Sequence, residues 1–121
     1  MQNIKANVVS ALQTSTALHT LISDRIYFHY PNSFNNLPAL SYFEYNNAGD
    51  LFADNVEIGS EIIFQLDVWA NNSTSAIALV VDTIMTGLDF VRIGAVDLYE
   101  KETSTHHKSM KYRLDYSDPA F

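Results

Sequence analysis

Hydrophobic residues near the start of the chain recur at spacings of three and four positions, as they do along one face of an α-helix. We expect this helix to cover residues 3–22, and its apolar stripe consists of Ile4, Val8, Ala11, Leu12, Leu18, Leu21 and Ile22. Serine and threonine cluster at positions 14–16, and their side chains compete for backbone hydrogen bonds. The sequence therefore predicts a helix with a weak point that can divide it into two shorter pieces.

Segments rich in β-branched and aromatic residues follow, and they predict strands. The expected strands are Ile26–Tyr30, Ala39–Tyr45, Val56–Ala70, Phe90–Tyr99 and Lys108–Tyr116. The third has the clearest alternation of apolar and polar residues, so we expect it at the centre of the sheet. The residues expected to face inward from the last two strands are Val96, Leu98, Met110, Tyr112, Leu114 and Tyr116.

A second helix is predicted directly after Ala70, because the polar residues at 71–74 suit a helix N-cap. Its apolar stripe consists of Ala76, Ile77, Val80, Val81, Ile84 and Leu88. The order of elements predicts an α+β fold, with a mainly antiparallel sheet of about four to five strands and two helices packed on one face. No repeat or linker divides the chain, so we expect one domain over residues 1–121 with a loose C-terminal tail at 117–121.

The composition of the chain excludes several kinds of catalytic and binding chemistry. A chain of 121 residues with 47% hydrophobic residues suits one core, and the absence of cysteine excludes thiolate catalysis, zinc fingers and iron–sulfur ligation. The four glycines are isolated, and no Gly-x-Ser-x-Gly motif is present, which argues against a nucleotide-dependent or serine-nucleophile enzyme. The net charge of −7, with seven scattered basic residues, argues against direct nucleic-acid binding. No apolar run is long enough for a membrane span or a signal peptide. We therefore expect no enzymatic activity, no cofactor and no membrane partner.

Two groups of residues could still carry chemistry. His106 and His107 are adjacent, but neighbours in a strand point to opposite faces, so a solvated connection between strands is a better interpretation than a metal site. Asp67 beside Trp69 could be a buried acid in a ligand pocket, whereas a polar side chain that bonds to a neighbouring strand is the simpler interpretation. Neither group predicts a catalytic or metal site.

Some of the many aromatic residues are expected on a surface that another protein covers. A turn-rich loop is predicted at 46–55, and Leu51 and Phe52 lie in its middle near Asp54. Such a loop either carries an anchor for a partner or folds its apolar residues back on itself. The candidate interface residues are Leu51, Phe52, Asp54 and Phe34.

Several short motifs occur in an order that resembles a known family. They are Ser23-Asp24-Arg25-Ile26-Tyr27 after the first helix, Leu37-Pro38-Ala39-Leu40 before a strand, and Ile63-Phe64-Gln65-Leu66-Asp67-Val68-Trp69 before the second helix. The series, over about residues 4–117, is similar to the tail terminator or tail completion proteins of long-tailed bacteriophages. Ser23 departs from the glycine that is frequent at that position in the family.

The resemblance implies a non-enzymatic virion protein that forms a ring, commonly a hexamer, at the head-proximal end of the tail tube. There it would stop tube polymerisation and contact the tail tube protein and the head connector or neck proteins, after assembly in the host cytoplasm. DNA would only pass through as cargo, and an acidic lumen would let it slide. Another head–tail connector and, in a different class, a small ligand-binding module around Asp67 and Trp69 remain as alternatives.

Overall fold

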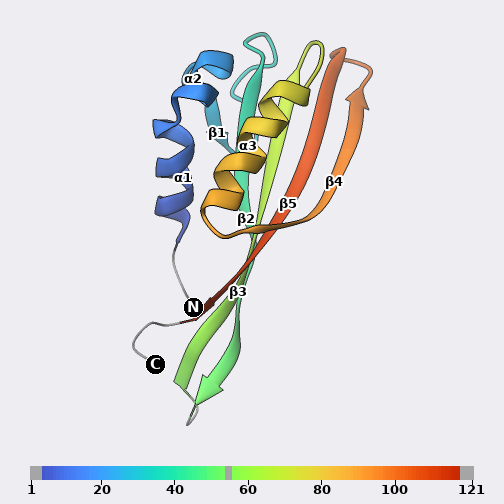
Figure 1. Cartoon of the computed structure of the whole chain (residues 1–121). Coiled ribbons are helices and arrows are strands. Elements are labelled where there is room, and N and C mark those ends of the chain that lie inside the picture. Colours follow the sequence, from blue (N-terminus) through green and yellow to red (C-terminus); the bar gives the residue numbers. More distant parts are fainter. Residues whose placement is uncertain (1–3, 54–55, 118–121) are drawn as a thin grey trace.

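The computed structural model describes residues 4–53 and 56–117 and shows three helices over one face of a five-stranded sheet (Figure 1). The elements in chain order are α1 (Lys5–Thr14), α2 (Thr16–Ile22), β1 (Ile26–Phe28), β2 (Ala39–Ala53), β3 (Val56–Ala70), α3 (Ser75–Gly87), β4 (Val91–Glu100) and β5 (Thr105–Ser117). The predicted α+β class and the mainly antiparallel sheet are confirmed. Within the described ranges, no helix has the length and apolar character that crossing a membrane requires.

The predicted weak point in the first helix is a real break at Ser15. Its backbone is extended, with φ −71° and ψ 116°, and this ends α1. Its Oγ accepts a hydrogen bond from the backbone N–H of Leu18 at 3.2 Å, which caps α2. The N-terminal segment therefore forms two helices rather than one.

The sheet has the order β1-β2-β3-β5-β4. β1 runs parallel to β2, and every other neighbouring pair is antiparallel. α3 connects β3 to β4, and β5 lies between these two strands, so this half of the fold is a split β-α-β unit. The sheet consequently ends in β1 on one side and in β4 on the other.

The core lies between the helices and the sheet. Alternate residues of β3 are fully buried there, and α1, α2 and α3 contribute Val8, Leu12, Leu18, Ile22, Ile77, Val81 and Met85. Met110 and Tyr112 of β5 are also buried in this core, as predicted, and Leu114 is partly buried against it. Each fully buried aliphatic side chain stabilises the fold by about 1.5–3 kcal/mol relative to an exposed one.

The predicted turn-rich loop at 46–55 is wrong for residues 46–53, which belong to β2. They pair with β3 in a long antiparallel hairpin, from Asn46 opposite Ile63 to Ala53 opposite Val56. Register shifts near Glu44 and Gly49 accommodate the turn-prone asparagine, glycine and aspartate within the strand. We call residues 46–53 and 56–60 the arm, because this end of the hairpin extends past the helices (Figure 1). Asp54 lies outside the described residues.

Both ends of β5 also differ from the predicted strand Lys108–Tyr116. Residues 106 and 107 lie within β5, which starts at Thr105, and not in a connection between strands. Ser117, placed in the predicted loose tail, is the last residue of β5, and the remainder of that tail, 118–121, lies outside the described residues. The β5 ladder with β3 reaches Ser117 opposite Gly59, and this pairing overrides the local sequence signal.

Candidate interface surfaces

A buried polar cluster lies on the sheet face opposite the helices. The Nε2 atom of His107 is 2.8 Å from the Oδ1 atom of Asp67 on the neighbouring strand, and the His107 ring stacks on Trp69 with centroids 3.7 Å apart. Gln65 donates to both carboxylate oxygens of Asp67 at 3.1 and 3.2 Å. The indole N–H of Trp69 donates to Ser41 Oγ at 2.9 Å. We call Ser41, Gln65, Asp67, Trp69 and His107 the polar cluster.

The cluster is buried because the segment between β1 and β2 lies over it. The Phe34 ring meets the Trp69 ring edge to face at 5.3 Å, and Pro31 of the same segment is buried. Asp67 bonds to the neighbouring strand, as predicted, but it is only 3% exposed. The prediction of a solvated connection at His107 is wrong, since its side chain is only 11% exposed. The sequence could not predict that the segment between β1 and β2 buries this cluster, because the two regions are far apart along the chain.

The geometry of the cluster also tests the ligand-pocket alternative. A cavity of about 160 Å³ lies beside it, lined by His29, Tyr30, Phe43, Gln65, Asp67, Trp69 and His107. Ligand pockets usually have volumes of about 300–1,000 Å³. The polar groups are directed at one another, with the exception of His107 Nδ1, which is buried and has no hydrogen-bond partner within the described ranges. This arrangement suits a structural role in holding the covering segment on the sheet.

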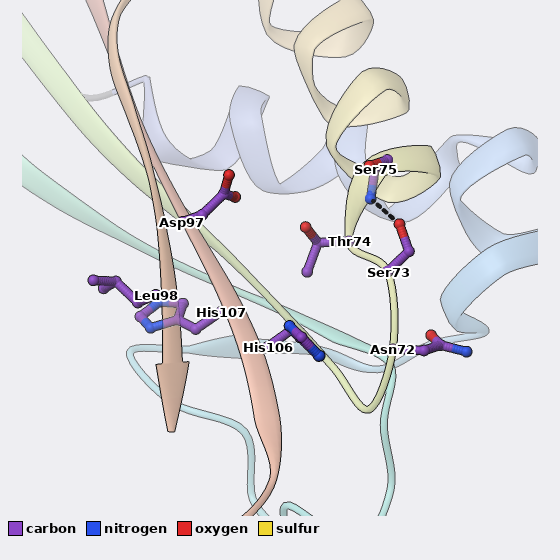
Figure 2. Close-up of a pocket in the computed structure, with 8 residues that line it drawn as sticks. All are labelled: Asn72, Ser73, Thr74, Ser75, Asp97, Leu98, His106 and His107. Atoms are coloured by element: carbon purple, nitrogen blue, oxygen red, sulfur yellow. Dashed lines mark hydrogen bonds between the residues drawn. The ribbon is translucent and has the colours of Figure 1, made fainter. Parts of the chain in front are cut away.

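A second hollow lies at the start of α3 (Figure 2). Its lining residues are Asn72, Ser73, Thr74, Ser75, Asp97, Leu98, His106 and His107. Ser73 Oγ accepts from the backbone N–H of Ser75 at 3.2 Å, and Asp97 accepts from Lys108 at 3.1 Å. The His106 and His107 side chains lie apart in this view, as expected for neighbours in a strand. The hollow therefore brings no pair of imidazoles to one point.

Exposed apolar side chains gather on β4. All ten of its residues are exposed, although neighbouring β5 contributes buried residues to the core. We call the following set the β4 surface, with exposed fractions between 46% and 59%: Val91, Ile93, Val96, Leu98 and Tyr99. The prediction that Val96 and Leu98 face inward is wrong, because they lie opposite Ser109 and His107 of β5, on the sheet face away from the helices. The alternation of Val96 and Leu98 resembles that of a core strand, so the sequence alone could not distinguish the two.

The predicted interface residues fall in two separate places. Phe34 packs on Trp69, which lies opposite Ala39 at one end of the β2–β3 hairpin, and the Phe34 side chain is 37% exposed. Leu51 and Phe52 lie in the arm at the other end, where they are opposite Gly59 and Glu57. The structure therefore does not bring the candidates together in one patch.

Comparisons with known proteins agree with this architecture. The family described as tail completion protein gp17 matches residues 6–116. A chain from the virion of a native gene transfer agent particle has the same fold, with a TM-score of 0.73, 16% sequence identity and coverage of 91% of each chain. A search of curated proteins found no match.

Proposed function

This chain belongs to the tail completion protein gp17 family, a family of structural phage tail proteins, and we propose that it forms a closed ring, a hexamer, at the head-proximal end of the tail tube. There it stops tube polymerisation and joins the tail to the head. Its partners are other copies of itself, the tail tube protein, and the connector or neck proteins of the head. The protein acts by binding, without catalysis.

The observation that carries this proposal is the pair of unlike edges of the sheet. A closed ring of identical subunits requires two different complementary surfaces on each subunit. β4 ends the sheet on one side with exposed apolar side chains, while β1 and the longer β2 end it on the other. The chain thus offers two distinct lateral surfaces for neighbours in a ring.

The arm supplies a third surface, suited to a partner above or below the ring. It extends past the helices, and its sequence includes the candidate anchors Leu51 and Phe52, with Asp54 beside them. We assign these three residues to contact with the tail tube protein or the head connector. Phe34 is a weaker candidate, because part of its ring is already covered by Trp69.

The virion particle that contains the similar fold supports a place for this chain in an assembled particle. In such a place DNA passes through the ring as cargo and makes no specific contact. The net charge of −7 agrees with this role, since an acidic lumen does not retain a polyanion. The ring would assemble in the host cytoplasm and remain in the virion.

Another head–tail connector or neck protein is the second candidate, because the same two lateral surfaces suit any ring at this junction. It differs in its partner. A small ligand-binding module is disfavoured, since the cavity beside Asp67 and Trp69 is small and its polar lining is largely used within the chain.

The test is the mass of the purified protein over a concentration series, with and without the tail tube protein. We expect a species of six subunits, either alone or on addition of tube protein. A chain that stays monomeric and does not bind the tail tube protein would exclude the terminator role. A ring that binds a head connector but has no effect on tube length would favour the neck role.

A variant with a shortened arm separates ring formation from binding to partners. Replacing residues 49–60 by Asn-Gly joins Ala48 to Glu61, which are opposite each other in the hairpin, through a two-residue turn. We expect this variant to form the ring but to lose at least about tenfold in affinity for tube protein or connector, as loss of an interface anchor does. Far-UV circular dichroism and thermal unfolding report whether the remaining fold is intact.

A further inference from the structure

We propose that neighbouring copies join by strand addition, with β4 of one copy pairing with the open edge of β2 in the next. This inference rests on the proposed ring and specifies the contact within it. The partner is a second copy of this chain, and the joined sheets form one continuous sheet around the ring.

The first argument is that β4 has few of the features that usually protect an edge strand. Such strands are kept from pairing by free charges, proline, bulges or short length. β4 has ten residues, and its bulge lies near one end, between Arg92 and Gly94. Ala95–Glu100 is a regular ladder that carries Val96, Leu98 and Tyr99. This part of β4 is therefore open to a further strand.

β4 carries three charged residues, Arg92, Asp97 and Glu100, and the first two are already paired within the chain. Arg92 donates to Asp82 of α3 at 3.1 Å, and Lys108 of β5 donates to Asp97 at 3.1 Å. Glu100 is at the last position of the strand, and the rest of the edge is mainly backbone and apolar side chains.

The second argument is a matching open edge on the other side of the sheet. β1 pairs only with Leu40, Ser41 and Tyr42, whereas β2 continues to Ala53. Among the described residues, no strand pairs with that side of β2 over residues 43–53. The part of this edge nearest β1, residues 43–48, is as long as the regular Ala95–Glu100 ladder of β4, and the variant with the shortened arm retains it.

The third argument is strand direction. β2, β3, β5 and β4 are successively antiparallel, so β4 runs opposite to β2. Each copy in the ring is related to the next by rotation about the ring axis. If that axis runs roughly along the strands, the rotation preserves strand direction, and β4 of one copy meets β2 of the next as an antiparallel pair.

The two edges are also offset along the strand direction. β4 lies level with Ile63–Ala70 of β3, while the open part of β2 lies further toward the arm. The strands must therefore tilt against the ring axis, as strands in closed barrels do by roughly 35–45°.

Cysteine pairing tests the contact directly, because the chain has no cysteine of its own. A chain with Val96→Cys is mixed with chains that carry one cysteine at successive positions from 43 to 48. We expect intersubunit disulfides at alternate positions of β2, since every second side chain shares a face and disulfides need Cα atoms within about 7 Å. Leu79→Cys on α3, which is 70% exposed, serves as the control and should give none.

A disulfide of Val96→Cys with itself would indicate a symmetric β4–β4 contact and overturn the proposal. Absence of crosslinks along β2 in a sample that forms rings would also overturn it. The second outcome leaves the ring itself in place, so it differs from a chain that never assembles, which would refute the proposed function.

Charge insertion gives an independent measurement. The double variant Val96→Lys with Leu98→Lys should raise the concentration needed for assembly at least about tenfold, because it places two charges in an apolar contact. Leu79→Lys should change that concentration less than about twofold. Thermal unfolding of the monomers checks that both variants fold. Equal assembly of the double variant and the wild type would contradict the proposed contact.

Discussion

Ser23 connects α2 to β1 through a backbone conformation that side chains rarely adopt, with φ 56° and ψ −128°. Its backbone N–H donates to the carbonyl of His19 at 2.8 Å and ends the helix. Residues with a Cβ in such regions cost of order 1–3 kcal/mol, and glycine avoids this cost. The local geometry therefore favours glycine at position 23.

We predict that Ser23→Gly stabilises the chain by about 1 kcal/mol, since the relieved strain exceeds the added entropy of the unfolded state. Urea unfolding would show a higher midpoint with an unchanged slope. Thr20→Gly, in the interior of α2, is the matched control and should destabilise by about 1 kcal/mol. Equal effects of the two substitutions would refute the explanation from backbone strain.

His107 and its neighbour His106 provide another matched pair. His107 stacks on Trp69 and bonds to Asp67, whereas His106 is exposed. We predict that His107→Ala costs about 2–3 kcal/mol, because it removes the stacked ring and leaves a buried carboxylate with fewer partners. His106→Ala should change stability by less than about 0.5 kcal/mol. Thermal unfolding of the two variants makes the comparison, and similar losses would contradict the burial seen at His107.

The sequence predicts the burial and contacts of some of these side chains but not of others. The cross-strand bond of Asp67 follows from its place on a strand, and the buried positions of Met110 and Tyr112 follow from alternation. The burial of His107 depends on the segment that carries Phe34, which reaches the sheet only in the folded chain. Local pattern contains no information about that contact.

At the scale of elements, Tyr112 joins β5 to the helix layer. Its hydroxyl donates to Asp82 of α3 at 2.9 Å, and Arg92 of β4 donates to the same carboxylate oxygen at 3.1 Å. Burial, with a further contribution from the hydrogen bond and negative charge of Asp82, raises the pKa of the Tyr112 phenol well above its ordinary value. Three elements thus meet at one carboxylate.

This pKa shift predicts a stability that depends on alkaline pH. The folded chain holds the Tyr112 proton more tightly than the unfolded chain, so the contribution is complete below about pH 10 and is lost as pH rises above it. Tyr112→Phe should cost about 1 kcal/mol at neutral pH and remove up to about 1.4 kcal/mol per pH unit of the loss above pH 10. Urea unfolding between pH 8 and pH 11 measures both. An unchanged slope in the variant would contradict the assignment to Tyr112.

At the scale of elements, the sequence predicts some helices and strands, but it does not predict where every strand ends or which strands are neighbours. The break at Ser15, the β3 segment and α3 follow from local propensity and periodicity. The length of β2 does not, because Asn46, Gly49 and Asp50 favour turns in isolation and only pairing with β3 extends the strand through them. The exposure of β4 could not be predicted from the sequence either, since its residues would suit a buried strand.

For the whole molecule, the family and the α+β fold could be predicted from the order of short motifs, and the family match over residues 6–116 confirms the resemblance. The surfaces that form the contacts of the proposed ring could not be predicted from the sequence. A lateral contact depends on which strands end the sheet, and strand order is set by long-range pairing between β3 and β5. The candidates Leu51, Phe52, Asp54 and Phe34 remain predictions for partners outside the ring plane.

The position of β5 between β3 and β4 has a consequence for how quickly the chain folds. The β2–β3 and β4–β5 hairpins each form from segments adjacent in sequence, a process that takes microseconds in small hairpins. The β3–β5 ladder must instead join residues as distant as Gly59 and Ser117, and such non-local pairing slows folding. Docking of the two hairpins is thus expected to limit the rate, and until it occurs β3 and β5 are both open to pairing with the wrong chain.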